Sequence, residues 1–355
     1  MKMTSLTKRL VLVGLILIAG GCGSPMTYNL NAPAKILTPV GAAGVIDGRA
    51  RYRQIFCGLL TEGIDPQPPG TTCESWLHRL SDEPESATPP ARNPLLLEKT
   101  RFFIVPGYAG DAAPANMMPW GASIETLLSE GFQLEYLMVS GGGSAAHNAD
   151  QIAEALQRLE LTREDRVVLI GYSKGTIDIL HFVVNHPEMV AKVDAVVSIA
   201  GAVNGSPLAD EIPDKVGKII TKMGGGSVGD AGGMDSLRRS VQMNWLARNP
   251  LPDGPQYFSL AAFTDRKNVS SILRGGYDRL ALVDPRNDAQ VIFYDQIIPA
   301  STLLGYANGD HWAVALPFQE QAKTYAATIM NRNRFPRTEL LEAVLLYVQE
   351  TLASP

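Results

Sequence analysis

Short apolar runs alternate with amphipathic segments along the chain from residue 101 onward. Six runs have the length and composition of strands buried on both faces of a sheet, and they lie at 102–105, 134–139, 167–170, 195–200, 257–263 and 302–306. Helical spacing marks the segments between them, as in Ile152, Leu156 and Leu159, in 176–184 and in the last segment, 340–352. This alternation predicts an α/β fold, a mostly parallel central sheet with helices on both faces.

The composition argues against nucleic-acid binding and against a structural zinc site. Hydrophobic residues make up 45% of the chain and charged residues 19%, which is the balance of a globular protein. The formal net charge is -5, so no excess of positive charge is available for phosphate backbones and we expect no nucleic-acid partner. The three cysteines include no pair at C-x2-C spacing, so a structural zinc site is not expected.

Residues 1–21 have the plan of an export signal. Basic residues near the start precede an apolar run over 10–19 that is shorter than the about 20 residues of a membrane-spanning helix. Small residues directly before Cys22 resemble a bacterial lipobox, which implies that Cys22 becomes the lipidated first residue of the mature protein. The alternative is an ordinary cleavable signal with an incidental cysteine. We expect a lipid-anchored protein of the bacterial cell envelope, on the periplasmic or outer-membrane side.

Three further segments follow the signal. Residues 22–39 are short of charge and contain several prolines, so they suit a tether. Residues 40–98 form an N-terminal extension that we expect to pack on the main domain, 99–355. In an oxidising compartment Cys57 and Cys73 can form a disulfide, and a bridge closing such a loop contributes about 3 kcal/mol. Two unrelated free thiols are the alternative.

The strongest chemical signal is the motif Gly-Tyr-Ser-Lys-Gly at 171–175. It follows the apolar run 167–170 at once and opens the helical segment 176–184, as a G-x-S-x-G nucleophile elbow requires. Small residues two positions either side of the serine let the strand and helix backbones approach in a sharp turn that lifts the hydroxyl above the sheet edge. We therefore expect Ser173 to be a nucleophile, and a structural glycine-rich turn is the alternative.

A serine hydroxyl is a weak nucleophile until a base removes its proton. His311 follows the last predicted strand in a loop at 307–312, and loops of this kind meet at the carboxyl edge of a parallel sheet. We expect His311 to be the base, with a plain surface-loop histidine as the alternative. Four other histidines lie in the extension, in a glycine-rich loop and in or after the elbow helix: His78, His147, His181 and His186.

A carboxylate between the last two strands should orient the histidine and stabilise its charged form. Two aspartates have the same local pattern of acid, polar and apolar residues. Asp288 precedes His311 by 23 positions and is our first choice, and Asp295 precedes it by 16 and is our second. Asp265 and Asp284 remain as further alternatives.

Stabilising a tetrahedral oxyanion calls for two backbone N–H groups that face the serine. The elbow itself supplies the amide of Lys174. The loop 105–111 after the first strand should supply the other, because Gly107 and Gly110 allow a tight backbone turn, and Tyr108 is our choice. The alternative is a Pro-Gly turn without a role in chemistry.

With serine, acid and histidine in this order, residues 100–355 resemble the α/β-hydrolase superfamily, and 199–210 and 287–289 look like segments of bacterial lipases. The resemblance implies an esterase or lipase that hydrolyses carboxylic esters, often of lipids, without a cofactor. The chain departs from lipases at 106–107, where His-Gly is more usual, and at Asn204, where a histidine is common. The calcium-site pattern of one lipase branch is not evident, so no metal is predicted.

Residues 205–255, here called the cap, lie between two predicted strands where an insertion would cover the serine. We expect a cap or lid with glycines at 224–226 and 232–233 as hinges. Three apolar side chains are candidate contacts for an acyl group, or simply fix the cap to the body: Met234, Met243 and Trp245.

The predicted mechanism is two-step acyl transfer. Ser173 attacks an ester carbonyl while His311 takes its proton, and water then cleaves the acyl-enzyme. The expected partner is a small-molecule or lipid ester. Two alternatives stay open from the sequence: an acyltransferase with the same triad, and a catalytically silent envelope lipoprotein built on a hydrolase fold.

Overall fold

The computed structural model describes residues 43–63, 68–81, 83–84, 99–162, 164–223, 226–317 and 335–353. The predicted signal peptide, the tether and Cys22 lie outside these ranges. Among the helices of the described ranges, none combines the length and the apolar character that crossing a membrane would need.

The described residues form a seven-stranded sheet in the order β1-β7-β6-β5-β4-β2-β3, and every neighbouring pair is parallel. The predicted α/β fold class and the six predicted strands are confirmed. The strands are β1 (Ile46–Asp47), β2 (Thr100–Val105), β3 (Gln133–Tyr136), β4 (Arg166–Tyr172), β5 (Ala195–Ile199), β6 (Gln256–Ala262) and β7 (Thr302–Ala307).

The sequence did not predict β1. This strand belongs to the N-terminal extension and pairs with β7, with Ile46 opposite Thr302 and Asp47 opposite Leu303. The extension therefore adds an edge strand to the central sheet in addition to packing on it. Two residues are too few to give an apolar or alternating signal, which explains why the pattern did not reveal the strand.

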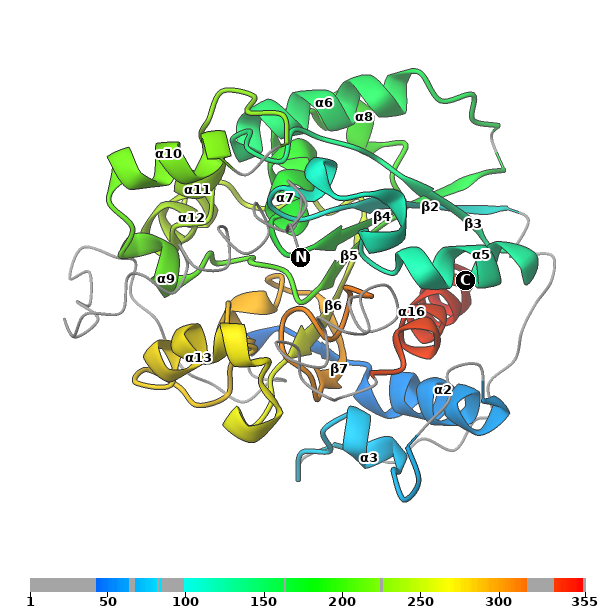
Figure 1. Cartoon of the computed structure of the whole chain (residues 1–355). Coiled ribbons are helices and arrows are strands. Elements are labelled where there is room, and N and C mark those ends of the chain that lie inside the picture. The colour runs from blue at the N-terminus through cyan, green and yellow to red at the C-terminus, as the bar shows by residue number, and fades with distance from the viewer. Residues whose placement is uncertain are drawn as a thin grey trace, which may run out of the picture.

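Alternation along the strands separates two hydrophobic layers. Phe102 and Ile104 of β2 face one layer, whereas Phe103 and Val105 face the other. The first layer lies under α2 (Arg49–Glu62), α5 (Gly121–Ser129) and α16 (Arg337–Ala353). The second lies under α6 (Ala145–Gln157), α7 (Lys174–Asn185) and α8 (Pro187–Val190), so helices cover both faces of the sheet (Figure 1).

The cap contains four short helices between β5 and β6, which gather at one end of the molecule (Figure 1). These helices are α9 (Pro207–Asp210), α10 (Asp214–Met223), α11 (Gly233–Ser236) and α12 (Arg239–Leu246). Other short elements complete the described chain: α3 (Cys73–Trp76), α13 (Arg274–Leu280), and the 3-10 turns η2 (Gly110–Ala112), η3 (Ala115–Met117), η4 (Arg266–Asn268), η5 (Ser271–Leu273) and η6 (Phe293–Gln296).

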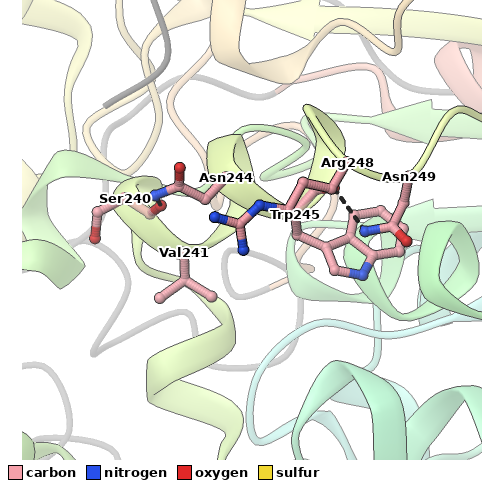
Figure 2. Close-up of a pocket in the computed structure, with 6 residues that line it drawn as sticks. All are labelled: Ser240, Val241, Asn244, Trp245, Arg248 and Asn249. Carbon is pink, nitrogen blue, oxygen red and sulfur yellow. Dashed lines mark hydrogen bonds between the residues drawn. The ribbon is translucent and has the colours of Figure 1, made fainter. Parts of the chain in front are cut away.

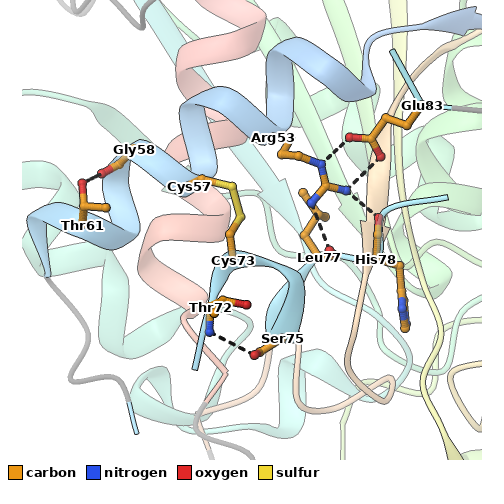
Figure 3. Close-up of a disulfide and its surroundings, with 10 residues drawn as sticks. All are labelled: Arg53, Cys57, Gly58, Thr61, Thr72, Cys73, Ser75, Leu77, His78 and Glu83. Carbon is orange, nitrogen blue, oxygen red and sulfur yellow. Dashed lines mark hydrogen bonds and ion pairs between the residues drawn. A yellow bond between two sulfur atoms is a disulfide. The ribbon is translucent and has the colours of Figure 1, made fainter. Parts of the chain in front are cut away.

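A disulfide joins Cys57 of α2 to Cys73 of α3, the pairing expected from the sequence (Figure 3). The segment that follows Cys73 lies against the end of β7: Leu77 forms an antiparallel bridge with Ala307, and the amide of Asn308 donates to the carbonyl of Trp76 at 2.7 Å. The bridged extension thereby holds the strand end that leads into the loop of His311.

Arg53 of α2 fixes the same segment from the other side. Its guanidinium donates to the carbonyls of Leu77 at 3.1 Å and His78 at 2.6 Å and forms an ion pair with the buried carboxylate of Glu83 (Figure 3). Both backbone carbonyls are thereby satisfied by a charged donor, which strengthens the hydrogen bonds.

Candidate active site

Ser173 lies in a strained turn between β4 and α7. Its backbone has φ 55° and ψ −124°, a conformation that L side chains rarely adopt. A Cβ on Gly171 would lie 2.4 Å from the Cα of Thr176, and a Cβ on Gly175 would lie 2.1 Å from the carbonyl oxygen of Val105. Glycine is therefore required at both flanking positions, which is the physical reason for the motif.

The structure brings Ser173, His311 and Asp288 together in one line of hydrogen bonds. His311 Nε2 lies 2.9 Å from Ser173 Oγ, and His311 Nδ1 lies 2.7 Å from Asp288 Oδ2. The histidine is 4% exposed and the aspartate is fully buried, while the serine is half-buried. These are the three residues that the sequence analysis put first as candidate nucleophile, base and acid.

Backbone contacts fix the carboxylate of Asp288. Its Oδ1 accepts hydrogen bonds from the amides of Gln290 at 2.9 Å and Val291 at 2.7 Å, which leaves Oδ2 for the imidazole. The amide of His311 also donates to the Asp288 carbonyl at 2.7 Å. Asp288 and His311 are thus held to each other by main chain as well as by side chain.

Asp295, the second choice for the acid, has a different set of partners. It is fully buried and forms an ion pair with Arg239 of α12 at 2.8 Å, and its Oδ1 accepts from Asn204 Nδ2 at 3.0 Å. The structure therefore gives this carboxylate a role in fastening the cap. The two remaining candidates pair with neighbouring cations: Asp265 lies 3.6 Å from Lys267, and Asp284 lies 3.2 Å from Arg286.

The other four histidines lie in different surroundings. His181 stacks on Trp245 of α12 at 3.8 Å between ring centroids, and burial lowers its pKa to about 4. His78 stacks on Phe263 at 4.0 Å. The remaining two meet polar side chains, since Nε2 of His186 lies 2.9 Å from Asp150, and Nε2 of His147 lies 3.4 Å from Gln151.

Two residues that the sequence analysis did not single out support His311. The ring of Tyr172 stacks on the imidazole at 5.1 Å between centroids, and its hydroxyl donates to the His311 carbonyl at 2.7 Å. Burial, together with the nearby Asp288 and Asp310 carboxylates, raises the pKa of Tyr172 far above its ordinary value, so the hydroxyl stays protonated as a donor. The sequence feature that could have pointed to this support is the aromatic residue directly before Ser173.

Asp310 is the second supporting residue. It is fully buried, and it accepts from the amide of Ser270 at 2.7 Å, from the Ser270 hydroxyl at 2.6 Å and from the amide of Ala313 at 2.9 Å. Burial raises the pKa of Asp310, and these hydrogen bonds oppose the shift. The loop that carries His311 is thereby held on both sides of the imidazole.

The two amides proposed for the oxyanion belong to the loop after β2 and to the start of α7. A Cβ on Gly107 would lie 2.8 Å from Ser173 Cβ and 3.3 Å from its Oγ, so the loop after β2 passes directly beside the hydroxyl. Within the described part of the chain, no acceptor takes the amide of Tyr108, the next residue. Lys174 is the first residue of α7, where the helix leaves its N–H groups free for a ligand.

The cap packs on this loop. The Tyr108 hydroxyl donates to Thr221 Oγ1 of α10 at 2.8 Å, and the Tyr108 ring lies against Ala209, Ile220 and Met234. Met234 therefore packs within the cap and against Tyr108, and Trp245 packs on His181 of α7. Both contacts favour the interpretation that these side chains fix the cap to the body.

The glycines expected as hinges have a packing role where the structure describes them. A Cβ on Gly232 would lie 2.7 Å from Ser144 Cβ, and a Cβ on Gly233 would lie 2.8 Å from the carbonyl oxygen of Gly142. The amide of Gly233 donates to that carbonyl at 3.0 Å. These glycines let the cap base approach the loop at 140–144 closely.

A separate depression lies along α12 and the turn after it (Figure 2). Its volume is about 520 Å³, and it is lined by Ser240, Val241, Asn244, Trp245, Arg248 and Asn249. None of the three residues in the hydrogen-bonded line borders it. In the described ranges, no cluster of three or more His, Cys, Asp or Glu side chains could hold a metal ion.

Fold and site together define an α/β-hydrolase: a parallel sheet, a serine in a strained elbow after β4, and an acid and a histidine on loops at the same sheet edge. Among solved structures, the chain is similar to the metagenomic carboxyl esterase MGS0156, with 34% identity, a TM-score of 0.83, and coverage of 90% of this chain and 97% of that one. It also matches the mature lipase BlEst2 of Bacillus licheniformis, with 19% identity and a TM-score of 0.51 over 66% of this chain and 93% of that one, a likeness of fold alone.

No protein-family model and no curated protein matches the chain. The likeness to MGS0156 extends over nearly the whole of both chains. The chain therefore belongs to the same family as this carboxyl esterase, within the α/β-hydrolase superfamily.

Proposed function

We propose that the protein is a serine hydrolase that cleaves carboxylic esters through an acyl-enzyme on Ser173. The observation that carries this proposal is the continuous line from Ser173 Oγ to His311 at 2.9 Å and on to Asp288 at 2.7 Å. A hydroxyl hydrogen-bonded to an imidazole whose other nitrogen meets a buried carboxylate is the arrangement that activates a serine. Membership in the family of a carboxyl esterase supports the choice of ester as substrate class.

Each residue has a defined part in the reaction. His311 takes the proton of Ser173 as the hydroxyl attacks the ester carbonyl, and it then gives this proton to the leaving alcohol. Asp288 holds the proton of the imidazole on Nδ1, so that Nε2 is free to accept, and stabilises the imidazolium that forms. The amides of Tyr108 and Lys174 donate to the oxyanion, and a water activated by His311 releases the acid.

The protein is further proposed to be exported and lipid-anchored through Cys22. The arrangement of the first 22 residues motivates this proposal, and the Cys57–Cys73 disulfide agrees with an oxidising compartment. The test is the mass of the mature N-terminus after expression in a bacterium, with Cys22→Ala as the matched variant. A diacylglycerol-sized mass on the Cys22 peptide supports the anchor, and an unmodified N-terminus downstream of residue 22 contradicts it.

The enzymatic proposal is tested by hydrolysis of a p-nitrophenyl ester series from acetate to palmitate. Wild type should turn these esters over, and Ser173→Ala should lose on the order of a million-fold in kcat while its melting temperature stays within a few degrees. Turnover by folded Ser173→Ala at a rate near wild type would overturn the assignment.

The same assay separates hydrolysis from acyl transfer, because the two reactions differ in the second step. Water as acceptor gives free acid, and an alcohol acceptor gives a new ester. We expect free acid to be the main product when glycerol or a short alcohol is added. A new ester as the main product at low acceptor concentration would reassign the protein as an acyltransferase.

A further inference from the structure

A buried ion pair lies directly beside the nucleophile. Lys174 follows Ser173 in the chain, and its ammonium lies 2.7 Å from the Oδ1 of Asp178, one helical turn along α7. Both side chains are 1% exposed. Lysine and aspartate are almost never fully buried unless they are paired, as these two are, so the question is what a buried pair does at this position.

The pair continues into a chain of buried hydrogen bonds. The second carboxylate oxygen of Asp178 accepts from Asn148 Nδ2 on α6 at 2.8 Å, and the same nitrogen donates to the carbonyl of Ser140 at 3.0 Å. Asn148 is fully buried. Burial raises the pKa of Asp178, and Lys174 and Asn148 oppose that shift by favouring its charged form.

The far end of this chain lies at the place where the cap meets the body. Ser140 opens the loop 140–144, and the amide of Gly142 in this loop donates to the carbonyl of Ser227 at 2.9 Å. The loop's carbonyl at Gly142 accepts from Gly233, and the amide of Ala145 donates to Ser236 Oγ at 2.8 Å. Side chains and loop thus connect the residue after the nucleophile to the base of the cap.

Stability alone does not account for this arrangement. Well-packed apolar residues of similar volume are often as stabilising as a buried ion pair, because removing two charges from water is costly. The pair does something that apolar residues cannot: it fixes the direction of a long side chain whose own backbone N–H is the proposed oxyanion donor next to Ser173. Errors of about 1 Å in such a donor cost about a hundredfold in rate.

We propose that Asp178 and Asn148 are positioning residues, which hold the Lys174 side chain and through it the Lys174 amide in the direction that stabilises the oxyanion. The inference rests on the proposed acyl transfer at Ser173 and deepens it. Because Asn148 also binds the loop under the cap, the position of the cap base and the direction of this amide are coupled.

The test replaces the pair by apolar residues in the double variant Lys174→Met/Asp178→Leu. We expect a melting temperature equal to wild type or higher, a KM within about threefold, and a kcat lowered about 10- to 100-fold on p-nitrophenyl butyrate. The rate of phosphonylation of Ser173 by a fluorophosphonate should fall by a similar factor, because this reaction uses the same amides.

A matched control removes another buried ion pair between cap and body. The double variant Arg239→Met/Asp295→Leu should change stability and leave kcat within about threefold. Equal losses of kcat in the two double variants would show that the Lys174–Asp178 pair is merely structural and would overturn the inference. A wild-type kcat in Lys174→Met/Asp178→Leu would also overturn it. If Lys174→Met/Asp178→Leu does not fold, the deciding measurement is the kcat of Asn148→Leu, which keeps the Lys174–Asp178 ion pair. A lower kcat at unchanged KM supports the inference, and an unchanged kcat overturns it.

Failure of the inference differs visibly from failure of the proposed function. If the acyl-transfer proposal is wrong, folded wild type itself neither turns over the ester nor is labelled on Ser173. If the positioning proposal alone is wrong, wild type is active and labelled, and the variants of the buried chain behave like wild type or like the control.

Discussion

Asp288→Asn should lower kcat strongly, because His311 can no longer accept the proton of Ser173, while the fold is retained. One carboxylate oxygen accepts from two amides, Gln290 at 2.9 Å and Val291 at 2.7 Å, and the other faces His311 Nδ1 at 2.7 Å. An asparagine must keep its carbonyl oxygen on the two amides, because turning its NH2 group toward them would oppose donors to donors. The NH2 group therefore faces Nδ1.

This placement selects the wrong form of the imidazole. Nδ1 must then accept from the asparagine, so the proton sits on Nε2, and Nε2 can no longer accept the proton of Ser173. A triad with the wrong tautomer loses about 10,000-fold in kcat, which corresponds to about 5.4 kcal/mol of activation free energy. KM should change little, because Asp288 is fully buried behind His311.

The assay is the initial rate of p-nitrophenyl butyrate hydrolysis, with circular dichroism to check the fold. Asp295→Asn is the matched control, because it makes the same chemical change at an equally buried aspartate that pairs with Arg239. This control should keep kcat within about threefold and lose stability, since breaking a buried pair costs about 3 kcal/mol or more. Equal losses of kcat in the two variants, or a loss below about tenfold in folded Asp288→Asn, would refute the reasoning.

Three further predictions concern the disulfide, the oxyanion loop and an acid-sensitive histidine. Cys57→Ser/Cys73→Ser should lower the melting temperature by about 6 °C, because the disulfide contributes about 3 kcal/mol of stability and each kcal/mol corresponds to about 2 °C. A reductant should lower the melting temperature of wild type equally, and an unchanged melting temperature would contradict this prediction. Gly107→Ala should lower kcat about 10- to 100-fold, because the added Cβ would lie 2.8 Å from Ser173 Cβ, and a wild-type kcat in ester hydrolysis would be evidence against the assigned loop. Burial lowers the pKa of His181 to about 4 in the folded protein. As pH falls, the imidazole is therefore protonated in the unfolded chain before it is protonated in the folded protein, and the free energy of unfolding drops by about 2 kcal/mol between pH 7 and pH 4.5. Urea unfolding of His181→Phe should lack that component, and an identical pH dependence would contradict the assignment.

Much of the fold could be predicted because buried parallel strands are continuous apolar runs. The strand before Ser173 and the helix after it follow from such runs, and they place the serine in a turn that two glycines make possible. The position of His311 follows from the same logic, since the loop after a parallel strand opens at the edge where the elbow lies. The two-residue strand β1 has no such run and was missed.

The candidate acid could not be chosen firmly from the sequence because the same local pattern occurs at Asp288 and at Asp295. Asp288 and Asp295 differ in their partners, and the partner that distinguishes Asp295 is Arg239, which comes from the cap 56 positions earlier in the chain. The support of His311 by Tyr172 was missed for a similar reason: the two residues are 139 positions apart, and their contact exists only in the folded chain.

The most direct test of the central claim is the intact mass of the protein after reaction with a fluorophosphonate, because this reagent requires no assumption about the substrate. Wild type should gain a single adduct, and Ser173→Ala and His311→Ala should gain none under the same conditions. That result would establish an activated serine at the elbow. An adduct on folded Ser173→Ala, or no adduct on folded wild type, would contradict the account.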